Sequence, residues 1–162
     1  MAGVGNSPAA KSERTAATDG NTRPEDRAEG GSSATPSLHG YLNHMPSAAP
    51  RIIREPIPLA DVRTLAESGF GDMVKAAVDV SRALMALGGE LHSDEEAVLL
   101  EDGSRQSDVW GINIYPDEPG DAWIEFDSMI NVRPGQGNRS RSVDDAVIEA
   151  SIRRVVDALI RR

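Results

Sequence analysis

Two alternating apolar and polar segments separated by a turn place the strongest constraint on the fold. In residues 109–115 apolar side chains fall at every second position, which is the period of a strand with one buried face. Residues 116–121 contain two prolines, one glycine and three acidic residues, a composition typical of a turn. The alternation resumes in residues 123–133, so we predict an antiparallel hairpin of two strands.

The second of these predicted strands separates into two faces. One face is apolar except for Ser128, and we expect it to meet the core through Ile124, Phe126, Ile130 and Val132. The other face is mainly polar and carries Trp123, Glu125, Asp127, Met129, Asn131 and Arg133. A sheet with one apolar and one polar face is typical of antiparallel architectures.

The composition changes at about residue 50. Residues 1–50 are rich in Gly, Ser, Ala, Pro, Thr and charged residues, and their few large apolar residues show no period. Such a segment cannot bury enough surface to offset the entropy of ordering it, so we predict a disordered leader, 1–50, before a single folded domain, 51–162. The same composition also fits residues translated from a start codon upstream of the true one. His39 and His44 lack the third ligand that would indicate a metal site there.

Charge and residue usage exclude several classes of function. The formal charge is −9 at pH 7, and residues 51–162 hold thirteen basic and twenty-one acidic side chains. An acidic surface repels a phosphate backbone, which argues against broad nucleic-acid binding. The chain has no cysteine, which excludes disulfides, thiolate zinc sites and cysteine nucleophiles. Without an apolar run of about eighteen residues or a signal-peptide pattern, we expect a cytoplasmic protein with no membrane partner.

Three helices are expected around the predicted hairpin. Apolar residues at helical spacing predict a helix over about 59–67, which Ser68-Gly69 ends. Ser93-Asp-Glu-Glu96 before an apolar run has the pattern of a capping box, and it predicts a helix over about 94–101. Ser-Val-Asp-Asp from residue 142 precedes a long apolar stripe, and it predicts a final helix to about residue 160.

Residues 71–92 fit two structures. Helical spacing relates Met73, Ala77, Val80, Leu84 and Leu87, which is the pattern of an amphipathic helix. The same segment also alternates as a half-buried strand would, with Val74, Ala76, Val78 and Val80 on one side. Periodicity alone favours the helix slightly, because alanine is common here and favours helices.

Several motifs occur together between residues 52 and 161. They include Gly88-Gly-Glu-Leu-His-Ser-Asp-Glu-Glu96, Trp110-Gly-Ile-Asn-Ile-Tyr-Pro116 and Asn131-Val-Arg-Pro-Gly-Gln-Gly-Asn-Arg-Ser-Arg141. In combination they resemble a family of small, uncharacterised bacterial proteins known only as a domain of unknown function. The family brings no activity, but the resemblance implies that 73–80 and about 83–91 form a hairpin. The predicted fold is therefore α+β, an antiparallel sheet of four or five strands with two or three helices packed on one face.

The loop at residues 131–141 is the first candidate site. Its glycines let backbone amides approach a ligand, and a forked guanidinium matches a phosphate or carboxylate. We therefore predict a binding module for a small anionic ligand or an acidic partner segment, with the candidate residues Asn131, Arg133, Gln136, Asn138, Arg139 and Arg141. In the alternative interpretation, the arginines pair with Asp127, Glu125 or the aspartates at the start of the final helix, and hold the turn.

Carboxylates and a histidine form a second candidate site. Glu125 and Asp127 share one strand face, and Glu90 and His92 join them if the two predicted hairpins lie side by side. Such groups suit Mg²⁺, Mn²⁺ or acid–base catalysis, so a metal-assisted hydrolase is the alternative function. No resident metal ligands or cofactor are assigned. Solvated carboxylates on an open sheet face are the commoner explanation.

Large side chains on the polar face form a third candidate. Trp123, Tyr115 and Met129 are expected near one another, where they would stack on a base or fill a partner's pocket. A homodimer whose interface is this polar sheet face would have the same pattern.

Overall fold

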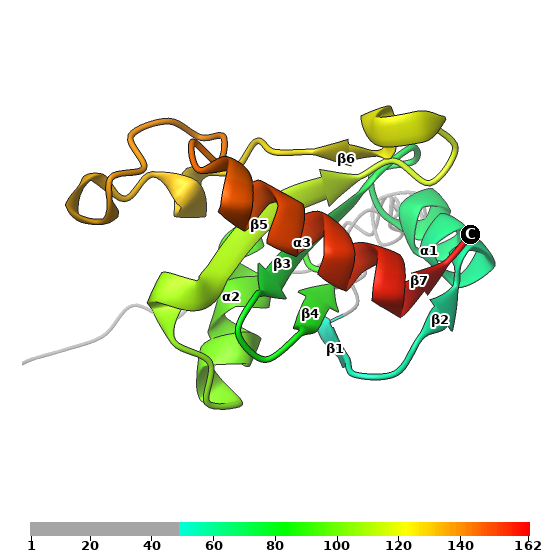
Figure 1. The fold of residues 1–162 in the computed structure, drawn as a ribbon. Helices are drawn as coiled ribbons and strands as arrows, with labels where there is room; N and C mark the ends of the chain where they lie inside the picture. The colour runs from blue at the N-terminus through cyan, green and yellow to red at the C-terminus, as the bar shows by residue number, and fades with distance from the viewer. Residues whose placement is uncertain (1–48) are drawn as a thin grey trace, which may run out of the picture. The chain divides into compact units, whose positions relative to one another are not determined.

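The computed structural model describes residues 49–162, and the expectations for residues 1–48, including His39 and His44, lie outside that range. Within it, five strands form an antiparallel sheet in the order β1-β4-β3-β5-β6 (Figure 1). The strands are β1 (Arg51–Ile53), β3 (Val74–Asp79), β4 (Leu84–Leu87), β5 (Val109–Ile114) and β6 (Ile124–Glu125). This sheet and the three helices of the described chain confirm the predicted α+β class.

Residues 74–87 form the β3–β4 hairpin, which resolves the ambiguity between helix and strand. Ala76 lies opposite Leu87 and Asp79 opposite Leu84. The Asp79 carboxylate accepts hydrogen bonds of 2.9 Å from the backbone amides of Ser81 and Arg82, which shapes the turn. β3 is paired with both β4 and β5 and is buried on both faces. Burial on both faces removes the polar half of the period, so the strand alternation was weak in the sequence.

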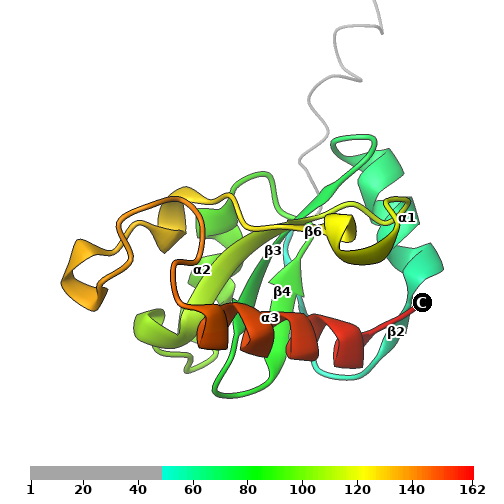
Figure 2. The same cartoon turned by 45° about the horizontal axis from the view of Figure 1, so that its top comes forward.

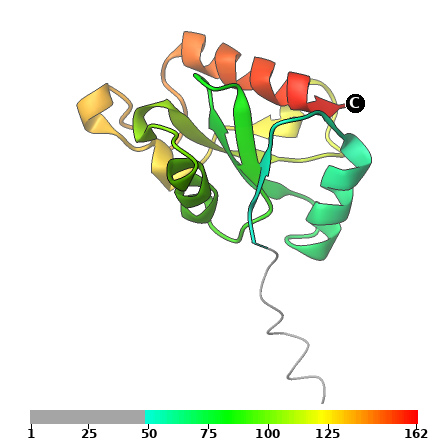
Figure 3. The same cartoon turned by 90° about the horizontal axis from the view of Figure 1, so that it is seen from below.

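Two helices, α1 (Leu59–Ser68) and α3 (Ala146–Leu159), pack on one face of the sheet as predicted, and α2 (His92–Glu101) packs on the other. Figure 3 shows α3 on one side and α2 on the other. The main core joins α3 and α1 to the sheet, and it includes the predicted stripe of α3. A smaller apolar cluster packs α2 through Leu99 against Ala77, Ala86 and Val109. Helices on both faces follow from the burial of the central strands on both faces.

The caps of two helices differ from those predicted. In α2 the Asp94 carboxylate accepts from the backbone amide of Leu91 at 3.1 Å, so the helix begins at His92 rather than after a Ser93 cap. The final helix begins at Ala146, directly after the Ser142-Val-Asp-Asp145 segment, and its cap is Asp145 rather than Ser142. Asp145 caps it by accepting from the amide of Val147 at 2.8 Å.

The long strand predicted over 123–133 is also wrong beyond its first residues. β6 pairs with β5 as expected, through Ile124 opposite Ile114 and Glu125 opposite Asn113, and then ends. The chain turns through the short 3-10 helices Met129–Asn131 and Pro134–Gln136. Another 3-10 turn, Gly120–Trp123, precedes β6, so the apolar and polar alternation of 123–133 does not correspond to two faces of a strand.

A separate two-stranded parallel sheet joins a segment near the start of the described chain to its last residues. β2 (Ile57–Pro58) pairs with β7 (Ile160–Arg161), and Figure 2 shows the end of α3 running into this pair beside α1. In the part of the chain that the structure describes, no helix combines the length and the apolar character needed to cross a membrane.

Candidate functional site

Asn131 completes the edge of β5 where β6 has ended. Its Oδ1 accepts from the amide of Gly111 at 2.8 Å, and its Nδ2 donates to the carbonyl of Gly111 at 2.9 Å. The side-chain amide thus replaces the peptide group of a neighbouring strand. Nδ2 also donates to the Arg141 carbonyl at 2.9 Å, and the residue is fully buried. All polar atoms of this side chain are bonded within the fold.

Asn138 organises the loop in a similar way. Arg133 and Asn138 face each other across a closed turn, with backbone hydrogen bonds of 2.7 and 3.2 Å. The Asn138 Nδ2 donates to the carbonyls of Asn131 and Ser142 at 2.8 and 2.7 Å. Its Oδ1 accepts from the amide of Asp144 at 2.7 Å. The buried amide therefore links the turn to the start of α3.

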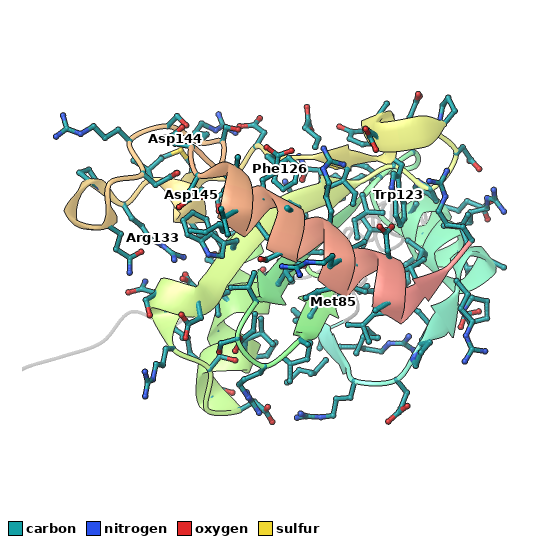
Figure 4. The ribbon with its side chains drawn as sticks, viewed as in Figure 1. Met85, Trp123, Phe126, Arg133, Asp144 and Asp145 are labelled. Atoms are coloured by element: carbon teal, nitrogen blue, oxygen red, sulfur yellow. The ribbon has the colours of Figure 1, made fainter. Side chains whose placement is uncertain are left out.

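Arg133 lies against the domain and points toward the start of β5 (Figure 4). Its guanidinium donates to the carbonyls of Ile130 and Val109 at 2.8 and 2.6 Å, and it lies 5.1 Å from the centre of the Trp110 ring. Burial lowers the pKa of Arg133, while Glu96, 3.4 Å away, raises it. The alternative interpretation expected Arg133 to pair with other carboxylates, but the fold uses this arginine mainly to satisfy backbone carbonyls.

The other candidate residues of the loop lie in different surroundings. Gln136 borders a shallow hollow beside Trp110, on the side of the loop that faces α3. The Arg139 side chain is exposed, and only its backbone amide bonds to Asp144, at 3.1 Å. Arg141 forms an ion pair of 2.7 Å with Asp127, as the alternative interpretation expected. The six candidates therefore do not converge on one ligand position.

A separate cleft collects most of the second candidate set. It has a volume of about 480 Å³ and lies between the start of α2, the sheet and the 127–130 segment. Its polar lining comes from Lys75, His92, Ser93, Asn113, Tyr115, Glu125, Asp127 and Arg141. Lys75 lies opposite Asn113 on β5, which lies opposite Glu125 on β6, so strand register aligns a polar row across three strands. The cleft thus joins the predicted residues His92, Glu125, Asp127 and Arg141.

His92 is one of the lining residues of this cleft. Its Nε2 lies 2.9 Å from the carbonyl of Ile112. Because a carbonyl only accepts, this nitrogen carries a proton, and Nδ1 of the neutral ring is a hydrogen-bond acceptor. Burial lowers the pKa of His92, and the positive charge of Lys75 acts in the same direction. The neutral ring is therefore the dominant form at neutral pH.

Glu125 is held by two neighbours in the cleft. Its Oε2 accepts from Asn113 Nδ2 at 2.8 Å and from the Tyr115 hydroxyl at 3.1 Å. Desolvation and the adjacent Glu125 carboxylate raise the pKa of Tyr115, so the phenol stays protonated and donates. The Oδ1 atom of Asn113 is buried and has no hydrogen-bond partner among residues 49–162.

Two expected members of the polar face lie elsewhere. Glu90 borders a neighbouring hollow rather than this cleft. Trp123 is only 3% exposed and belongs to the main core, where Arg162 covers its ring at 4.6 Å. The expectation of Trp123 on the polar face is wrong, because the 3-10 turn before β6 directs its side chain inward. Tyr115 and Met129 do line the cleft.

A family model described as "Protein of unknown function (DUF5674)" matches residues 51–159. The chain belongs to this family. The match confirms the resemblance drawn from the motifs, and it covers nearly the same span. No curated protein and no solved structure matches the chain.

Three polar residues that line the DUF5674 cleft, Lys75, Ser93 and Asn113, were not predicted as site residues from the sequence. Lys75 could have been predicted as a site residue, because it is the only basic residue in the apolar run of β3. Asn113 shares a face with Tyr115, but its position opposite Glu125 depends on strand register. Within residues 49–162 no three histidine, aspartate or glutamate side chains gather closely enough to hold a metal ion.

Proposed function

We propose that the DUF5674 domain binds a small anionic molecule that also carries hydrogen-bond donors, such as a hydroxy acid or an amino acid. The observation that carries the proposal is the convergence of two cations and several acceptors in one open cleft of about 480 Å³. The proposed ligand class is the one expected for the loop at residues 131–141. The proposed position is different, because it is the cleft that Arg141 lines rather than the whole loop.

Two basic side chains of the cleft, Lys75 and Arg141, would bind the anionic group of the ligand. Lys75 forms no ion pair with any residue of the described chain. Its side chain lines both the cleft and a neighbouring hollow, where its ammonium lies 5.0 Å from the centre of the Phe70 ring. Arg141 is paired with Asp127, but their side chains are 57% and 44% exposed. An exposed pair of this kind contributes only about 0–1 kcal/mol. A ligand carboxylate or phosphate can therefore compete with Asp127 for the guanidinium.

The acceptors of the cleft would bind the donor groups of the ligand. Nδ1 of His92 and the remaining lone pairs of the Glu125 and Asp127 carboxylates can accept further hydrogen bonds from a ligand that carries donors. A hydroxyl or ammonium group on the ligand would supply such a donor. The charges of the cleft also balance, with two cations against two carboxylates and a neutral histidine. A ligand with both an acidic and a donor group fits such a lining best.

Thermal unfolding of the full chain tests the proposal with a panel of lactate, malate, serine, aspartate and 3-phosphoglycerate. A ligand at about 100 times its Kd stabilises the folded state by about 2.7 kcal/mol. We expect at least one compound to raise the Tm of the wild type and to have no effect on the Lys75→Gln, Arg141→Gln double variant.

Arg139→Gln is the matched control, because it removes an exposed arginine of the same loop that does not line the cleft. It should bind like the wild type. Loss of binding in Arg139→Gln alone would return the site to the loop, and no shift with any compound would refute the proposed ligand class.

Acid–base catalysis in the same cleft is the second candidate, favoured by the presence of His92 and Glu125 in one lining. A metal-assisted hydrolase would need a tighter set of ligands than the described residues form. Calorimetric titration with Mg²⁺, Mn²⁺ and Zn²⁺ distinguishes a metal-assisted hydrolase from acid–base catalysis without a metal. Heat that disappears in His92→Asn would support the hydrolase, whereas no heat with any metal would remove its metal-assisted form.

A further inference from the structure

A second hollow lies beside the cleft and is mainly apolar. It has a volume of about 380 Å³, and it is lined by the end of α1, the 69–73 turn, Val74 and Lys75 of β3, and residues 88–91. Lys75 also lines the cleft. Phe70 and Leu91 border it and are 47% and 60% exposed. Exposed apolar side chains gathered around a hollow are typical of a surface that another segment covers.

The chain enters the domain at the rim of this hollow. β1 is antiparallel to β4 with Arg51 opposite Leu87, so the chain before Arg51 runs toward residues 88–91. The Pro50 ring lies against Gly89, since a Cβ added to Gly89 would be 2.8 Å from the Pro50 Cγ. Gly89 itself lines the hollow. Whatever precedes Pro50 therefore begins next to it.

The preceding sequence contains one apolar cluster at a suitable distance. Leu38, Tyr41, Leu42 and Met45 are the large apolar residues of positions 5–50. Seven residues lie between Leu42 and Pro50, so these two positions are at most about 28 Å apart. We propose that the segment Leu38–Met45 docks into the hollow and places its apolar side chains against Phe70 and Leu91.

Charge and size favour this occupant over a second copy of the chain. The segment Leu38–Met45 contains no lysine, arginine, aspartate or glutamate, so it brings no permanent charge of its own into the hollow, whose charged lining residues are Lys75 and Glu90. The hollow of about 380 Å³ accommodates one or two large side chains, whereas a stable dimer buries about 800 Å² on each partner. A short tether also gives an effective concentration in the millimolar range, so weak contacts are enough.

Disulfide trapping tests the proposal in the full chain, which has no cysteine of its own. The first double variant joins Asn43→Cys to Ser68→Cys at the hollow, and the second joins Asn43→Cys to Ser93→Cys at the polar cleft. Both serines are exposed. Docking predicts intramolecular oxidation roughly tenfold faster for the Ser68→Cys pair, because the tether then holds that pair together.

Adding Tyr41→Ser and Leu42→Ser to each pair controls for distance along the chain. We expect these changes to remove the preference for Ser68→Cys, because they remove the docked side chains. Equal rates in the first two variants, or a preference that survives the serine substitutions, would overturn the proposal. Disulfides formed only between chains at micromolar protein would also overturn it, because a second copy would then supply the segment.

Discussion

Replacement of Glu95 by glutamine should make the domain less sensitive to alkaline pH. Glu95 lies on α2 and is fully buried. Its Oε1 accepts from the amide of Gly89 at 2.6 Å, and its Oε2 has no hydrogen-bond partner in the described part of the chain. Desolvation raises the pKa of Glu95 from its ordinary value of 4.5 to about 7. Between about pH 4.5 and pH 7 the folded state therefore keeps a proton on Glu95 that the unfolded state releases.

The sign and size of the effect follow from linkage. Because the folded pKa is raised, the stability from the bound proton is complete below pH 4.5 and is lost as the pH rises through about 7. At about 1.4 kcal/mol per tenfold change, the full loss is about 3 kcal/mol, of which about 2 kcal/mol falls between pH 5 and 8. Glutamine keeps the carbonyl that accepts from Gly89 and has no proton to lose.

Urea unfolding at pH 5 and pH 8, followed by the fluorescence of the two buried tryptophans, measures the difference. The advantage of Glu95→Gln over the wild type should grow by about 2 kcal/mol between these pH values. Subtracting the wild type removes the carboxylates common to both proteins. Glu101→Gln, at the exposed end of the same helix, should change stability by less than about 0.5 kcal/mol at either pH. A constant difference between wild type and Glu95→Gln would refute the reasoning.

Two substitutions test the junction between β5 and the loop. Asn131→Ala leaves the buried amide and carbonyl of Gly111 without partners, so urea unfolding should show a loss of about 3–5 kcal/mol. A loss below 1 kcal/mol would show that water replaces the amide. Gly111→Ala places a Cβ against Ser128, whose own Cβ would be 2.6 Å away and whose hydroxyl would be closer still. Overpacking of this kind costs about 1–3 kcal/mol or more, and a wild-type Tm would show that the 127–131 segment moves freely.

The sequence was informative where one element buries one continuous face. The alternation of β5 and the apolar stripe of α3 were both predictable, because each depends on local periodicity. β6 was predicted too long because the polar and apolar alternation continues through a 3-10 turn by coincidence. Nothing in the chain itself shows that the Asn131 side chain replaces the missing strand, since its partner Gly111 lies twenty residues away.

The candidate site was only partly predictable for a related reason. A sequence shows how many polar groups a segment carries, but not whether those groups form hydrogen bonds within the fold. Asn131, Asn138 and Arg133 appear available in the loop, yet backbone groups of distant segments occupy most of their donors. His92 and Glu125 were named as one set, but their shared cleft depends on the order of β3, β5 and β6.

The contrast between loop and cleft gives a physical reason to place function in the cleft. Within residues 49–162, three buried side-chain atoms have no hydrogen-bond partner, and they belong to Asp79, Glu95 and Asn113. Of these residues, Asn113 lines the polar cleft, where its Nδ2 already holds Glu125. An unsatisfied buried acceptor costs about 1–3 kcal/mol, and the loop amides show that this fold can satisfy such groups. The cleft instead keeps acceptors and an unpaired Lys75 in the same polar row, an arrangement that folding alone does not require and that a bound ligand would complete.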